Sequence, residues 1–141
     1  MKYQKLNAST YLIRIDQGEE VTEGLLAFAL QTGIGSASLS GCGGLEDVHL
    51  GYFHTQSGEY ISRPLPSGLL ELVSLTGTLT IDGGDPSLHV HAVVADEDLR
   101  CYGGHLLGAT VAATAEIVAI TTSAQVSRSF NDQLKIRELD L

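Results

Sequence analysis

The apolar positions in the first part of the chain predict one strand followed by one helix. Residues Thr10–Asp16 are rich in β-branched and aromatic types and end just before Gly18, which is typical of a strand. From Glu19 to Gln31 the apolar residues recur at intervals of three and four, and Gly33 stands where a C-terminal cap is expected. The pattern therefore predicts a strand and then the principal helix of the molecule.

The next segment predicts short strands separated by glycine-rich stretches. Ala37–Ser40 and Val48–His54 each fit a strand, with the flexible Gly41–Gly44 between them. Gly58–Gly68 contains Pro64 and a second proline, residues that interrupt regular pairing. This stretch is therefore expected to be an irregular connection.

Three apolar stretches dominate the second half of the chain. Leu69–Ile81 and Leu88–Ala95 flank the strong turn signal Asp82–Asp85, so we expect an antiparallel hairpin. Val111–Thr121 is almost wholly apolar, and its valine, isoleucine and threonine residues favour a buried strand over a helix. The alternating tail, Gln133–Leu141, predicts a terminal edge strand.

These elements together predict the α/β class in its α+β form: a mainly antiparallel mixed β-sheet with one principal helix. The chain has 141 residues, of which 43% are hydrophobic and 18% charged. That length and composition fit one domain spanning residues 1–141, with a substantial core.

The charge distribution disfavours direct binding to nucleic acid. Eight basic and seventeen acidic residues give a net charge of −9, and residues 15–127 hold only two of the bases against fourteen of the acids. Binding to a polyanion requires several gathered cations. Since no apolar run approaches the roughly 20 residues that cross a bilayer, and the first residues lack an apolar signal core, we expect no membrane contact and a cytoplasmic location.

The histidines carry the clearest chemical signal. Side chains alternate faces along a strand, so His89 and His91 project together from one side of Leu88–Ala95. His105 follows Gly103–Gly104, a glycine pair that is expected to turn the chain sharply back toward that strand. Three neutral imidazoles suit zinc or another late divalent metal and leave one coordination position open. The alternative is that these histidines are ordinary surface residues.

Two further residues near the histidines are candidates for chemistry. Glu116 is the only charge in a strand predicted to be buried, so it could be a metal ligand, a hydrogen-bond partner of a ligand, or a general base. A salt bridge to Arg128 or Arg63 is the structural alternative. Cys101 could act as a soft ligand, but is more readily interpreted as a small, partly buried apolar residue.

Several motifs, read in order over about Leu6 to Leu139, resemble the plants and prokaryotes conserved (PPC) domain family. They are Gly33-x-Gly35, Glu71-Leu-Val-Ser-Leu-Thr-Gly77, Leu88-His-Val-His91, Gly103-Gly-His-Leu106 with Gly108, and Ala115-Glu-Ile-Val118. The resemblance implies a mixed α/β domain with a mainly antiparallel sheet that assembles as a trimer. It also implies a metal held by the three histidines His89, His91 and His105.

The same resemblance implies less about DNA. In plant members an attached AT-hook with an Arg-Gly-Arg-Pro core contacts the minor groove, and this sequence contains no such core. It also has Gly68-Leu-Leu-Glu-Leu-Val73 in place of the plant Gly-Arg-Phe-Glu-Ile-Leu pattern. A DNA-binding or transcription-associated regulatory module remains an alternative, and it predicts that the basic residues of the two termini meet in space. They are Lys2, Lys5, Arg14, Arg128, Lys135 and Arg137.

The leading prediction is a small cytoplasmic homotrimer with a three-histidine divalent site, most simply zinc, that is open to a small-molecule ligand. One alternative makes it an enzyme, a metal-assisted hydrolase or lyase in which Glu116 moves a proton. Another is a cupin-like site, in which His89 and His91 are followed by Glu97 and Gly103. The cupin spacing fits less well than the Gly-Gly-His-Leu motif of the PPC family.

Overall fold

The structure is a computed structural model that describes residues 1–63 and 65–141. Pro64, part of the predicted irregular connection, lies outside the described residues. Nine strands and one helix follow one another in the part of the chain that is described. They are β1 (Lys2–Lys5), β2 (Thr10–Asp16), α1 (Val21–Thr32), β3 (Ala37–His54), β4 (Glu59–Ser62), β5 (Leu70–Asp82), β6 (Asp85–Ala95), β7 (Cys101–Thr121), β8 (Ser127–Asn131) and β9 (Ile136–Asp140).

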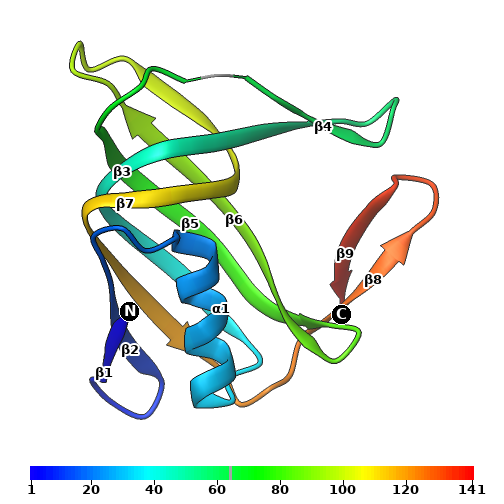
Figure 1. Cartoon of the computed structure of the whole chain (residues 1–141). Coiled ribbons are helices and arrows are strands. Elements are labelled where there is room, and N and C mark those ends of the chain that lie inside the picture. The colour runs from blue at the N-terminus through cyan, green and yellow to red at the C-terminus, as the bar shows by residue number, and fades with distance from the viewer. Residues whose placement is uncertain (64) are drawn as a thin grey trace.

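The strands form one strongly curved sheet in the order β1-β2-β7-β3-β5-β8-β9, while β4 pairs with β3. Strand β6 pairs with both β5 and β7, so β3, β5, β6 and β7 close a ring of antiparallel pairings. The parallel pairing in the described sheet is the single bridge between β5 and β8. The predicted class, a mainly antiparallel mixed sheet with one principal helix, is confirmed (Figure 1).

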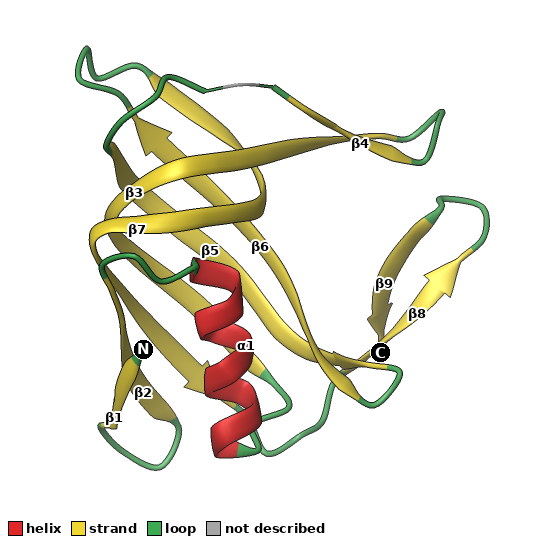
Figure 2. Ribbon diagram, in the orientation of Figure 1, coloured by secondary structure: helices red, strands yellow, loops and turns green. Residues whose placement is uncertain are grey.

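Helix α1 covers one face of the curved sheet (Figure 2). Its N-terminus is capped by Glu20, whose carboxylate accepts the backbone N–H of Glu23 at 2.6 Å. Gly33 ends it in the left-handed conformation, with φ of 69°, and donates its N–H to the Ala29 carbonyl. The helix is twelve residues long, and no helix in the described residues is long and apolar enough to cross a membrane.

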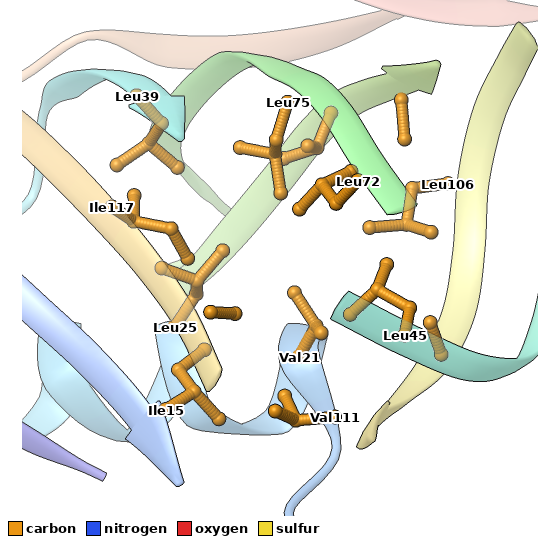
Figure 3. Close-up of a cluster of buried hydrophobic side chains, with 14 of the residues drawn as sticks. Ile15, Val21, Leu25, Leu39, Leu45, Leu72, Leu75, Leu106, Val111 and Ile117 are labelled. Atoms are coloured by element: carbon orange, nitrogen blue, oxygen red, sulfur yellow. The ribbon is translucent and has the colours of Figure 1, made fainter. Parts of the chain in front are cut away.

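The core lies between the helix and the inner face of the sheet. The buried cluster takes side chains from the helix and from β2, β3, β5, β6 and β7. Figure 3 shows part of this cluster, with the side chains pointing toward one another. Those labelled in the figure are Ile15, Val21, Leu25, Leu39, Leu45, Leu72, Leu75, Leu106, Val111 and Ile117. Burial of this apolar set fixes which side of β6 and β7 faces outward.

Strand β3 runs through the glycine stretch that was predicted to separate two strands. Gly41–Gly44 is not a flexible break, since Ala37–His54 is one strand of 18 residues. A Cβ atom on Gly41 would lie 2.6 Å from the Glu116 carbonyl oxygen, and one on Gly43 would lie 2.2 Å from that of Thr114. The glycines therefore allow β7 to approach closely, next to a register shift in the β3–β7 pairing between Gly43 and Leu45, instead of making a loop.

Strand β7 contains the glycine pair that was predicted to turn the chain. Gly103 and Gly104 do not turn the chain, because β7 already begins at Cys101 and the two glycines pair with Val93 and Ala92 of β6. The turn lies earlier, in residues 96–100. A Cβ on Gly104 would lie 2.8 Å from the Gly51 carbonyl oxygen, so this glycine makes room for β3.

The sequence pattern missed three short strands. β1 and β8 received no prediction, and β4 lies within the stretch predicted to be irregular. β8 pairs with β9, the predicted terminal strand, to form a hairpin attached to the body through β5. The β3–β4 pair and the β8–β9 hairpin project on the same side of the β5–β6 hairpin (Figure 1).

Candidate metal centre

The register of β6 and β7 brings the three predicted histidines together. His91 lies directly opposite His105 in the antiparallel pairing, and His89 is two residues before His91 on the same face of β6. The alternate residues Val90 and Ala92 are buried in the core. The imidazoles consequently stand on the outer face of the sheet, side by side.

The geometry of the three imidazoles is a compact triangle. Each pair of ring centroids is 5.2 Å apart, and one ring nitrogen from each residue lies within 4.8 Å of the others. The Nε2 atoms of His89 and His91 are 3.2 Å apart. Two nitrogens on one tetrahedral zinc, each about 2.05 Å from the ion, would be about 3.3 Å apart. The donor set and its spacing therefore fit a zinc-like ion.

The surroundings keep two of these histidines neutral near pH 7. Burial lowers the pKa of His105 from 6.5 to about 4, with further contributions from His89, His91 and Arg128. Burial also lowers the pKa of His89, assisted by the charges of Arg128 and His91. A neutral imidazole has a free lone pair, which is the form that a metal ligand requires.

The triangle forms part of the lining of a pocket of about 970 Å³. A second wall is aromatic and comes from the β3–β4 pair: Tyr52, Phe53 and Tyr60. The Tyr60 ring lies 4.8 Å from that of His105, and its hydroxyl is 3.4 Å from the His105 Nδ1. The volume of the pocket lies within the range of about 300–1,000 Å³ that is common for ligand pockets.

The third wall is basic and comes from the β8–β9 hairpin. It includes Arg128, Phe130, Lys135 and Arg137. On sequence grounds Arg128 was expected only to form a salt bridge with Glu116 or to contribute to a terminal basic surface. Its place in the pocket depends on contacts with residues about 50 positions away, for which the local sequence contains no signal.

Glu116 is not brought to the histidines. It pairs with Arg14 of β2 and Cys42 of β3, its side chain is exposed, and it is absent from the lining of the pocket. Within the described residues it forms no salt bridge, so neither the buried-carboxylate interpretation nor the predicted bridge to Arg128 or Arg63 is correct. β7 is buried on one face only, and Glu116 occupies the other face.

The other candidate ligands also lie outside the triangle. Cys101 is exposed at the start of β7, and Glu97 of the cupin alternative is exposed in the turn. His49 is exposed on β3, and His54 accepts the backbone N–H of Ser57. The groups of metal-binding type that cluster in the described residues are the three histidines alone.

The two basic ends of the chain do not meet. β1 and β9 occupy opposite ends of the sheet order, and the termini lie on opposite sides of the molecule (Figure 1). Arg14 lies 2.7 Å from Asp16, and Arg137 lies 2.6 Å from Asp82, so much of the basic charge is locally neutralised. The described residues therefore do not gather the basic side chains of the two termini into the single surface that the DNA-binding alternative predicts.

A curved antiparallel sheet with one covering helix and a three-histidine pocket defines the class of this molecule. The model of the Plants and Prokaryotes Conserved (PCC) domain matches residues 3–123. The chain therefore belongs to this family, as the motifs of the sequence indicated.

Solved structures of similar proteins share this fold. A protein from Bacteroides thetaiotaomicron, which has the provisional name of a DNA-binding protein, is 28% identical with a TM-score of 0.93, covering 99% of this chain and 96% of that one. A metal-containing protein from Archaeoglobus fulgidus is 27% identical with a TM-score of 0.85, covering 98% of each chain.

A curated relative is much longer than this chain. The bifunctional protein GlmU of a Synechococcus strain is 36% identical over 110 residues, which are 77% of this chain and 16% of the relative. The similarity therefore covers only a small part of that protein.

Proposed function

We propose that this protein binds one divalent metal ion, zinc, through His89, His91 and His105, and that the pocket admits a small ligand to the open coordination position. The observation that carries the proposal is the triangle of imidazole nitrogens within 4.8 Å of one another. The metal-containing name of the Archaeoglobus relative, whose fold is shared over nearly the whole chain, supports it.

The donor set determines what the ion would offer. Three neutral imidazoles leave the full positive charge of the ion in place, and zinc held in this way acts as a Lewis acid and lowers the pKa of bound water. The chain's own residues shape access to it, since Tyr60 lies against His105 and the aromatic wall borders one side of the pocket.

The test is elemental analysis of protein purified without an affinity tag and dialysed against zinc. We expect about one zinc per chain, and loss of nearly all of it in His89→Ala and in His105→Ala, because two remaining imidazoles bind zinc weakly. His49→Ala is the matched control, as it removes an exposed strand histidine outside the triangle. A wild-type protein without zinc, or equal zinc in all variants, would overturn the proposal.

We also propose that the chain assembles as a homotrimer. Support comes from an exposed apolar patch on the outer face of β2 and β7, where Leu12 lies across from Val118 and next to Ile120. Such a patch marks a contact surface. Light scattering should give three times the chain mass of 14.9 kDa. Ile120→Asp should reduce that mass, and a wild-type mass equal to one chain would contradict the assembly.

A further inference from the structure

The guanidinium of Arg128 is fixed at the pocket by neutral groups. Its Nε donates to the Thr80 hydroxyl at 3.0 Å, its Nη2 to the Thr78 hydroxyl at 3.1 Å, and its Nη1 to the Arg137 carbonyl at 3.0 Å. A guanidinium has five N–H groups, and these bonds use three of them. One N–H on each terminal nitrogen is left without a partner among the described residues.

Arg128 is an uncompensated positive charge in an acidic protein. Arg14, Arg100 and Arg137 each lie within 2.7 Å of an aspartate oxygen. Within the described residues Arg128 has no carboxylate within 4.0 Å. A fixed guanidinium that lacks an acidic partner is well suited to bind an anion, and its planar fork matches a carboxylate.

The register places this charge next to the histidines. Thr78, which accepts from Nη2, lies directly opposite His89 on the neighbouring strand, so both side chains stand on the same outer face. Thr80, which accepts from Nε, is two residues further along that face. An anion in the pocket would lie between the metal position and the guanidinium.

The opposite wall indicates the body of the ligand. Phe53 and Tyr60 pack edge to face with ring centroids 5.2 Å apart and line the pocket, and Phe130 adds a third aromatic ring from the β8–β9 wall. Aromatic walls favour a planar or apolar molecule over a bare ion. The charge of Arg128 therefore favours an anion, and the aromatic wall favours an anion that carries a planar, apolar group.

We infer that the pocket binds a small organic carboxylate with a planar, apolar body, that Arg128 pairs with the carboxylate, and that a second oxygen donor reaches the metal. This rests on the proposed function for its metal end only. The Arg128 end depends on the protein alone, so the two ends can be tested separately.

The experiment is calorimetric titration of the zinc-loaded protein, in its solution assembly, with isophthalate. Isophthalate carries two carboxylates on one ring, and isophthalamide and inorganic phosphate are the comparison probes. We expect isophthalate to bind, and both comparison probes to bind at least about tenfold more weakly, because a charge-assisted hydrogen bond is lost in one and the ring in the other. Phosphate binding as tight as isophthalate would overturn the organic body of the ligand.

Variants locate the carboxylate. Arg128→Gln should weaken isophthalate binding at least about tenfold without changing the zinc content, whereas Arg100→Gln, the same change outside the pocket, should bind normally. Equal binding by Arg128→Gln would overturn the inference. If that variant does not fold, nitrogen-15 NMR of the wild-type protein replaces it. The Nε–H signal of Arg128, assigned with Arg128→Lys, should shift on addition of isophthalate. A signal that does not shift would overturn the inference.

The metal and carboxylate ends fail differently. Zinc retained with no isophthalate binding overturns this inference and leaves the metal proposal intact. Absence of zinc overturns the metal proposal, and isophthalate binding that still requires Arg128 would then support the carboxylate anchor. Absence of both overturns both.

Discussion

The two ends of the β6–β7 hairpin differ in whether their polar side chains have charged or hydrogen-bonding partners within the protein. At the turn, one oxygen of the buried Asp96 accepts the backbone N–H groups of Asp98 and Arg100, and the other accepts the Tyr102 hydroxyl at 2.8 Å. At the far end, His89, His91 and His105 face one another with no carboxylate in their group. A polar cluster whose hydrogen-bonding groups are all paired within the protein stabilises the fold. A cluster without a charged partner is instead suited to bind a ligand.

The ionisation of the two clusters differs accordingly. Burial opposes the charge of Asp96, but hydrogen bonds from Arg100, Tyr102 and Asp98 hold its pKa below the ordinary value. The same bond to Asp96 raises the pKa of Tyr102. At the other end, burial and nearby positive charge lower the pKa values of His89 and His105 and oppose their protonation. The turn end therefore stabilises the negative charge of Asp96, whereas the histidine end is uncharged and suited to bind a positive ion.

The largest effect is expected where the strand pairing beneath the histidines is broken. In Gly77→Ala the new Cβ would lie 2.1 Å from the His89 carbonyl oxygen, so β5 and β6 must separate. We expect the free energy of unfolding to fall by about 3 kcal/mol, with weaker zinc binding. Urea unfolding and zinc titration measure the two losses.

The control for this substitution lies in the same hairpin. A Cβ on Gly103 would make an ordinary 3.4 Å contact with Val93, so Gly103→Ala should change the free energy of unfolding by less than about 1 kcal/mol. Equal losses in the two variants would mean that close approach at Gly77 is not what holds the histidine end together.

A smaller effect is expected at the turn end. Asp96→Ala removes the acceptor for two backbone N–H groups and the Tyr102 hydroxyl, so the melting temperature should fall by several degrees with zinc content unchanged. Asp98→Ala, which loses only an exposed pair with Arg100, should melt nearly as the wild type does. A loss of zinc in Asp96→Ala would show that the two ends are not independent.

The smallest effect concerns the acid stability of the metal-free protein. The pKa of His105 is about 4 in the folded state against an ordinary 6.5. Between these values the unfolded chain binds a proton that the folded protein does not, so the free energy of unfolding should fall as the pH drops from about 6.5 toward 4 and be unaffected by this group above that range. The effect is modest because the side chain is only partly buried.

Urea unfolding at about pH 7 and about pH 5, with a chelator present, measures this loss in the wild type and in His105→Gln. The variant should lose less stability over the interval, since it lacks the titrating imidazole. Identical losses in the two proteins would contradict the assigned environment of His105.

Local sequence signals were sufficient for the elements that depend on near neighbours. Strand Thr10–Asp16 was predicted with its observed bounds, the helix to within two residues at its start, and the Asp82–Asp85 turn in its place. The histidine triangle followed from the alternation of side chains on one strand and a third histidine nearby. These features lie within short segments, where periodicity and turn chemistry are decisive.

The errors have a common physical cause. Glycine was read as a source of bends, whereas Gly41, Gly43 and Gly104 are required because another backbone approaches. The turn itself is organised by Asp96, whose side chain accepts the N–H two residues later. Arg128 could not have been placed, because its position depends on strand β5, about 50 residues earlier.

The closeness of the three histidines in the chain has a consequence for how the protein matures. The three histidines belong to the adjacent strands β6 and β7. The ring of strands β3, β5, β6 and β7 is completed only when the rest of β7 pairs with the distant β3. Local hairpins form within microseconds, and distant strand pairings form far more slowly. We therefore expect the histidine triangle to assemble early in folding, so that a newly made chain presents its three imidazoles together before the ring of strands is closed.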